Sequence, residues 1–128
     1  MHSLITKGIR VTVQTYYDHE VSKPSLGRFI HAYQIKIENL SDRTVKLLSR
    51  HWKIYASDGV MREVKGDGVV GKQPVLQMLD VHEYTSWSPL PTPVGKMLGS
   101  FTMLDMESNE SFEVEVPEFK LIADYINN

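Results

Sequence analysis

Three glycines in the stretch KGDGVVGKQP, residues 65–74, have the spacing of a turn that binds a dinucleotide. Gly66, Gly68 and Gly71 follow the pattern G-x-G-x-x-G, in which backbone N–H groups hold a pyrophosphate at the start of a helix. That chemistry requires a strand before the glycines and a helix after them. Here Pro74 follows closely, and the residues after it show neither a helical apolar stripe nor a capping residue. The pattern therefore argues against a dinucleotide-binding fold.

Two interpretations of the glycine stretch remain open. In the first, the glycines meet the backbone requirements of a loop, such as a positive φ or the close approach of another chain segment. In the second, successive backbone N–H groups converge on a phosphate or a carboxylate. Basic residues flank the stretch and add positive charge, while Asp67 opposes them. The candidate anion-binding or partner-binding loop therefore consists of Arg62, Lys65, Gly66, Gly68, Gly71 and Lys72.

No other set of residues has the spacing of a known catalytic or metal site. Asp18-His19-Glu20 and His82-Glu83 are the closest sets, but consecutive residues on a strand point to opposite faces. The absence of cysteine excludes disulfides, thiolate zinc sites and cysteine nucleophiles. No serine occupies a G-x-S-x-G elbow, and no spacing suggests a carboxylate pair for acid–base catalysis. We therefore predict no catalytic residue, no bound metal and no cofactor; His31 is expected to be a core histidine whose polar atoms are satisfied.

Aromatic residues next to a proline-rich segment form a second candidate site. Tyr84 and Trp87 precede SPLPTPVG, whose prolines cannot donate to a central sheet ladder, so this segment is expected to be a loop or an exposed edge. Exposed aromatic residues beside it would suit a protein partner. The alternative is that both aromatic side chains pack in the interior. Tyr84 and Trp87 are the candidate partner surface.

The composition is that of an ordinary globular chain. Its 128 residues include 41% hydrophobic and 23% charged residues, which is enough for one core in a single domain spanning residues 1–128. The formal net charge of -2 gives no overall field that would attract nucleic acid or an anionic membrane. No stretch approaches the ~20 apolar residues of a membrane helix, and the N-terminus lacks the apolar run of a signal peptide. A cytoplasmic location is expected.

Apolar residues alternate with polar ones along most of the chain, which predicts half-buried antiparallel strands. The clearest examples are residues 9–17 and 28–40, followed by 44–57, in which Trp52 is expected in the core and two adjacent leucines indicate a bulge. Further strands are expected within 60–65, 79–87, 96–106 and 111–119, with Pro117 ending the last. The tail, residues 121–128, is compatible with a short helix or a strand. About seven strands with frequent turn signals predict an all-β antiparallel sandwich or small barrel.

Several runs, taken in order, resemble the ApaG family: SRHWKIYASDG, REVKGDGVVGKQPVL, YTSW, TPVGKMLGSFTM and FEVEVPEFKL. The resemblance covers residues 9–122 and is most specific in VKGDGVVGKQPVL. It implies an immunoglobulin-like or fibronectin type III-like β-sandwich. The family's genes are associated with a diadenosine tetraphosphate hydrolase and with cobalt and magnesium tolerance, and pyrophosphate binding has been proposed for its glycine motif. Similar domains occur in an F-box protein and a polymerase-delta-interacting protein, which suggests a protein-interaction module.

This chain departs from the family pattern at two places. Residues 78–80 read MLD where the family often has a Pro-Gly turn, and Trp87 stands where it often has glycine. The first departure puts the geometry of the turn in question, and the second adds a large apolar group beside the proline segment.

The resemblance therefore implies a non-enzymatic binding module for an unknown protein partner, acting through the glycine loop and the surface at Tyr84 and Trp87. The alternative is a protein that binds a small ligand, pyrophosphate or a nucleotide, with or without a divalent cation. Open sheet edges would also permit a homo-oligomer.

Overall fold

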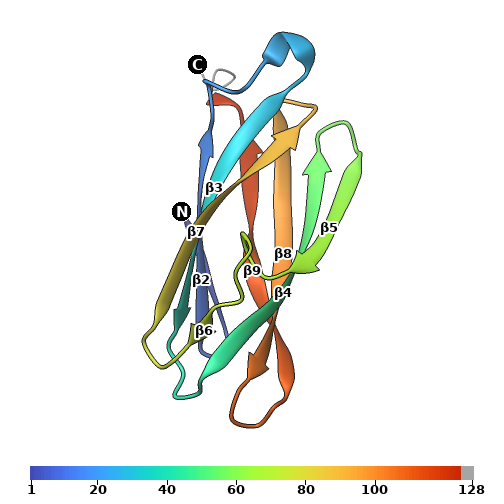
Figure 1. Cartoon of the computed structure of the whole chain (residues 1–128). Coiled ribbons are helices and arrows are strands. Elements are labelled where there is room, and N and C mark those ends of the chain that lie inside the picture. Colours follow the sequence, from blue (N-terminus) through green and yellow to red (C-terminus); the bar gives the residue numbers. More distant parts are fainter. Residues whose placement is uncertain (125–128) are drawn as a thin grey trace.

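Two antiparallel sheets form a β-sandwich (Figure 1) in the computed structural model, which describes residues 1–124. The first sheet has the order β1-β2-β3-β7, and the second has the order β5-β4-β8-β9 with β6 also paired to β4. The strands are β1 (His2–Thr6), β2 (Ile9–Tyr17), β3 (Phe29–Asn39), β4 (Val45–Ala56), β5 (Met61–Asp67), β6 (Val75–Leu76), β7 (Val81–Leu90), β8 (Val94–Asp105) and β9 (Ser111–Ile122). A single 3-10 turn, Pro24–Leu26, precedes β3.

The alternation in the sequence produces the observed burial. Along β3, Phe29, His31, Tyr33, Ile35 and Ile37 are all buried, while the residues between them are partly exposed over most of the strand. Because successive side chains on a strand point to opposite faces, one sequence parity supplies the core. The prediction of an all-β sandwich is confirmed, and no helix among the described residues is long and apolar enough to cross a membrane.

Nine strands are present in the described part of the chain, where about seven were expected. The two short strands, β1 and β6, were not predicted. Most of β1 is exposed, so its residues lack a buried parity, and β6 contains only two residues. Both strands exist because a neighbouring strand provides a pairing edge, which the local sequence does not show.

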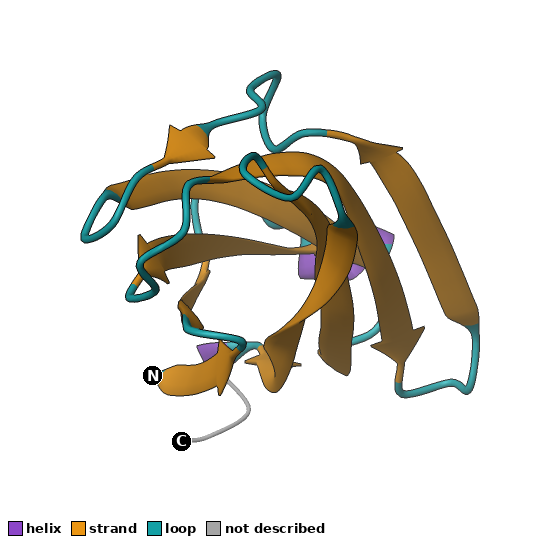
Figure 2. Cartoon of the chain, turned by 90° about the horizontal axis from the view of Figure 1, so that it is seen from below, coloured by secondary structure: helices purple, strands orange, loops and turns teal. Residues whose placement is uncertain are grey.

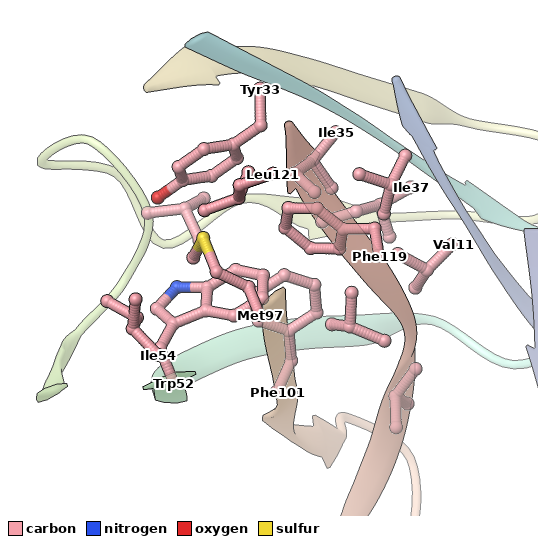
Figure 3. Packing of buried hydrophobic residues seen from close by; sticks show 14 of the residues in the cluster. Val11, Tyr33, Ile35, Ile37, Trp52, Ile54, Met97, Phe101, Phe119 and Leu121 are labelled. Carbon is pink, nitrogen blue, oxygen red and sulfur yellow. The ribbon is translucent and has the colours of Figure 1, made fainter. Parts of the chain in front are cut away.

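The core between the sheets is built around Trp52 (Figure 3). Its side chain is 3% exposed and makes edge-on contacts with Tyr33, Phe101 and Phe119 at centroid distances of 5.7, 6.0 and 6.0 Å. Edge-to-face pairs of this kind add to the stabilisation that comes from burying the rings. The prediction that Trp52 lies in the core is confirmed.

Two long strands contain irregularities. The register of β4 against β8 shifts between Leu47 and Ser49, which confirms the bulge expected at the leucine pair. The prediction that Pro117 ends a strand is wrong, because β9 continues to Ile122. Pro117 lies where the pairing of β8 with β9 shifts register, and β9 is an edge strand of its sheet, so a missing N–H is tolerated. Residues 125–128 of the tail lie outside the described residues.

The two lateral sides of the sandwich differ. On one side, β9 lies against β1, and the backbone N–H of Glu115 donates to Thr6 Oγ1 at 3.2 Å. On the other side, β5 and β7 are the edge strands of their sheets and are not paired to each other. The β4–β5 hairpin lies at one side of the molecule, with β5 paired to β4 from Met61 to Asp67 (Figure 1 and Figure 2). This open side positions the sites described below.

The turn between β6 and β7 has the conformation of a Pro-Gly turn, although it contains neither proline nor glycine. The N–H of Asp80 donates to the carbonyl of Gln77 at 3.0 Å, and Leu79 has φ +71 at the third position, as in a type II turn. Leu79 is 69% exposed, so its side chain adds little packing. A non-glycine residue in this region is strained by about 1–3 kcal/mol.

We expect Leu79→Gly to raise the free energy of unfolding by about 0.5–1 kcal/mol, because the relief of strain exceeds the extra flexibility that glycine gives the unfolded chain. Urea denaturation followed by circular dichroism measures the change. Leu26→Gly is the matched control: it replaces an exposed leucine without a positive φ, and it should lower stability. Equal losses in both variants would contradict the strain.

Candidate functional site

The glycine loop ends in a tight turn that accounts for Gly71. Val70 and Gly71 have φ +46 and +75, which is the pattern of a type I′ turn. The two residues that flank them, Val69 and Lys72, exchange two backbone hydrogen bonds of 2.8 and 3.0 Å. β6 follows the loop, and no helix does, so the arrangement required by a dinucleotide-binding turn is absent from this segment.

Gly68 is required for two separate reasons. Its φ of +64 lies in the left-handed region, and a Cβ atom built on it would overlap the backbone carbonyl oxygen of Lys72. Its N–H donates to the carbonyl of Leu48 at 2.9 Å, which fixes the loop against β4. A residue without a side chain is therefore needed at position 68 both for the positive φ and for the close approach of Lys72.

Gly66 makes room for an arginine from the neighbouring strand. A Cβ atom at Gly66 would lie 2.8–2.9 Å from the guanidinium of Arg50 on β4. That guanidinium lies across the glycine and donates through Nη1 to the carbonyls of Asp67 at 2.9 Å and Gly68 at 3.1 Å. The first two glycines of the motif thus position Arg50, which the spacing of the motif did not single out.

Hydrogen bonds within the loop use several of the groups that an anion would need. The N–H groups of Gly68, Val69 and Lys72 donate to carbonyls of the protein. An anion nest requires successive N–H groups that are directed at the ligand. The glycine loop as an anion site stays a prediction, whereas each glycine has a structural reason within residues 48–72.

The structure separates the basic residues that flank the loop. Arg62 lies on the inner side of β5, where Nη2 is 3.4 Å from Ser88 Oγ and 3.3 Å from the Pro89 carbonyl, both on β7. Lys65 lies on the outer side of the same strand, with Nζ 3.5 Å from Glu63. Lys72 is exposed at the end of the turn. The six candidate loop residues therefore do not converge on one point.

A cleft of about 210 Å³ opens between the edge strands β5 and β7. Its polar lining comes from both sheets: Arg50, Arg62, Tyr33, Ser86 and Ser88. Apolar side chains form the rest of the lining: Trp52, Ile54, Val64, Trp87, Pro89 and Met97. Burial raises the pKa of Tyr33, against the opposing effects of its hydrogen bond with Ser86 and of the Arg50 and Arg62 charges. The cleft therefore brings Arg62 and Trp87 of the two predicted sites together.

Tyr84 and Trp87 point to opposite faces of β7, so they do not form one surface. Tyr84 has the inward parity, and its hydroxyl is buried without a hydrogen-bond partner in the described chain. Burial raises the pKa of this hydroxyl well above its usual value. Trp87 has the outward parity and is 56% exposed.

An apolar row crosses the outer face of the first sheet at Trp87. Trp87 is paired with Ala32 on β3, and Ala32 is paired with Tyr16 on β2, so the three side chains share one face. Tyr16 is 50% exposed, and the next row contains Ile30 paired with Pro89. We call these five residues the aromatic surface. The sequence alone does not indicate Tyr16, because only the register between strands places it beside Trp87.

The histidines and acidic residues do not gather into a metal site: in the part of the chain that the structure describes, no three such side chains could hold one ion. His31 is buried as expected, at 1% exposure, but its Nε2 has no hydrogen-bond partner among residues 1–124, so the expectation of a satisfied histidine is wrong for this atom. Burial lowers the pKa of His31 to about 4, and the charge of Asp124 opposes the shift.

Comparisons with known proteins agree with this fold. The family model of the ApaG domain matches residues 19–105. Protein ApaG of Rhodospirillum centenum is 48% identical over 94% of this chain and 92% of its own length, and Protein ApaG of Vibrio cholerae is 47% identical over 94% of both chains. A crystal structure of a Bordetella pertussis protein described as ApaA has a TM-score of 0.86 and 39% identity, covering 89% of this chain and 92% of that one. The chain belongs to the ApaG family.

Proposed function

We propose that this protein is a non-catalytic binding module that docks a protein partner on the aromatic surface. The observation that carries the proposal is Trp87, which is more than half exposed on a sheet face where Tyr16 and Pro89 extend the apolar area. Tryptophan and tyrosine dominate the binding energy of many protein interfaces, because their large rings are rigid and keep one polar group.

Two of the perturbed ionisable groups, Asp105 and His31, have structural explanations. Hydrogen bonds from Arg43 hold the pKa of Asp105 at about 2, and this pair ties the end of β8 to the segment before β4. The low pKa of His31 results from burial in the sandwich. Shifted pKa values are also found at catalytic groups, so a shift alone does not indicate catalysis. An ion pair and core packing account for these two shifts.

Photo-crosslinking tests the docking site directly. Trp87 is replaced by the photoreactive residue benzoylphenylalanine in the full chain, and the cells that produce the protein are irradiated. We expect a discrete heterologous product whose partner is identified by mass spectrometry. Against that partner, Trp87→Ala should raise the Kd about 30-fold, as expected for a tryptophan at the centre of an interface.

The control places the same photoreactive residue at Leu26, which is 63% exposed in the turn before β3, and Leu26→Ala should leave the Kd within about twofold. A product of twice the chain mass would show that a second copy occupies the surface. That result, or identical products from both positions, would contradict a separate partner at Trp87.

A further inference from the structure

Two arginines line the cleft between β5 and β7 without a carboxylate partner. Arg50 donates only to the carbonyls of Asp67 and Gly68, and Arg62 makes two longer contacts, with Ser88 and the Pro89 carbonyl. Neither guanidinium forms an ion pair within residues 1–124. Arg10 and Arg43, by contrast, form ion pairs with Glu38 and Asp105. The cleft therefore holds two positive charges that protein carboxylates do not neutralise.

The opposite wall of the cleft adds hydrogen-bonding groups. Ser86 and Ser88 come from β7, and Tyr33 comes from β3, so hydroxyls of one sheet face the guanidiniums of the other. Guanidiniums bind carboxylates and phosphates through paired N–H donors, and hydroxyls supply further donors to the same oxygens.

Below these polar groups, the lining becomes apolar. Trp52 and Met97 are both nearly inaccessible to solvent, and Val64 and Ile54 extend the same wall. The volume of about 210 Å³ is below the range of drug-sized pockets, which begins at roughly 300 Å³. A fitting ligand is therefore small and has one charged end and one flat apolar end.

We propose that the cleft binds a small organic anion, with its carboxylate or phosphate group held by Arg50 and Arg62 and its apolar group against the apolar side chains of the lining. An anion in this position is attracted by both guanidinium charges. Arg62 is exposed, so the anion reaches the site from solvent through the open side of the sandwich. Trp87 and Pro89 border both this cleft and the aromatic surface, but the anion proposal rests on Arg50 and Arg62 and not on the partner proposed for the outer face.

Calorimetric titration with three probes tests the proposal at constant ionic strength: phenyl phosphate, benzoate and inorganic phosphate. We expect at least one aromatic anion to bind with a Kd in the millimolar range, and inorganic phosphate to bind about tenfold more weakly than phenyl phosphate. Binding of phenyl phosphate alone identifies a phosphate ligand, and binding of benzoate alone identifies a carboxylate ligand. Equal binding of phenyl phosphate and inorganic phosphate would overturn the apolar half of the site.

Variants assign the binding to this cleft. Arg62→Gln should raise the Kd of the bound aromatic anion about tenfold, because a charged donor is lost. Arg28→Gln is the matched control, since Arg28 is exposed in the loop before β3, and it should leave the Kd unchanged. Melting curves of both variants confirm that they are folded. Absence of binding by both aromatic anions, or loss of binding in Lys72→Gln and not in Arg62→Gln, would overturn the proposal.

Discussion

Gly68→Ala should lower the free energy of unfolding by about 2–4 kcal/mol. The backbone strain of a non-glycine residue contributes about 1–3 kcal/mol of this loss. Steric overlap adds to it, because the new Cβ would meet the Lys72 carbonyl, a backbone atom that cannot rotate away. Because backbone strain and steric overlap both occur at Gly68, the loss of stability is larger than at an ordinary surface glycine. Urea denaturation, followed by the fluorescence of the buried Trp52, measures it.

Gly71→Ala is the matched control for this prediction. Gly71 has a similar φ of +75, but a Cβ atom there would meet no heavy atom within 4 Å. Gly71→Ala should therefore lower the free energy of unfolding only by the backbone strain, about 1 kcal/mol. Equal losses at the two positions would show that the approach of Lys72 to Gly68 does not contribute.

Acidification from pH 7 to pH 5 should lower the free energy of unfolding by about 2 kcal/mol through His31 alone. The folded protein has the lower pKa, about 4, and the unfolded chain has the ordinary value of 6.5. Between these values the unfolded state binds the proton more readily, so stability decreases as the pH falls. The stability that comes from neutral His31 is fully present above pH 6.5 and is lost progressively as the pH falls from 6.5 to 4. Chemical denaturation at half-unit pH steps measures the slope.

His31→Leu should remove most of this slope, because leucine fills the buried position without titrating. His82, whose pKa burial also lowers, leaves a residual slope in the same direction. The depressed pKa values of Glu38 and Asp105 reduce stability only at lower pH, where the unfolded carboxylates take up protons. An unchanged slope between pH 6.5 and pH 5 in His31→Leu would exclude His31 as the cause.

The alternation of apolar and polar residues was sufficient to predict most strands, because a strand with one buried face has an apolar residue at every second position. β2 coincides with the alternating residues 9–17, and the bulge in β4 follows from its two leucines. Strands without this pattern were missed: β1 is mostly exposed and β6 is very short. Pro117 was misjudged because an edge strand with a register shift tolerates a proline that a central strand would reject.

The candidate sites were harder to predict, because they depend on register across strands far apart in the sequence. Tyr84 and Trp87 differ in parity, so the alternation already contained the signal that they face opposite sides. Tyr16 joins Trp87 only through the pairing of both with Ala32. The guanidinium of Arg50 occupies the space that the missing side chain of Gly66 leaves free. The local sequence around either residue does not show this contact.

The strand order also determines when the fold can form. Phe29 is paired with Leu90 in the first sheet, and Val45 is paired with Asp105 in the second, so nearly half of the chain lies between the members of each pair. Closing such long loops precedes most of the favourable contacts, which places the protein among slowly folding, high-contact-order β domains. β4 gains its central partner only after β8 has been synthesised. Until then β3 and β4 each have an unpaired edge, and unpaired strand edges are sites at which newly made chains pair with one another.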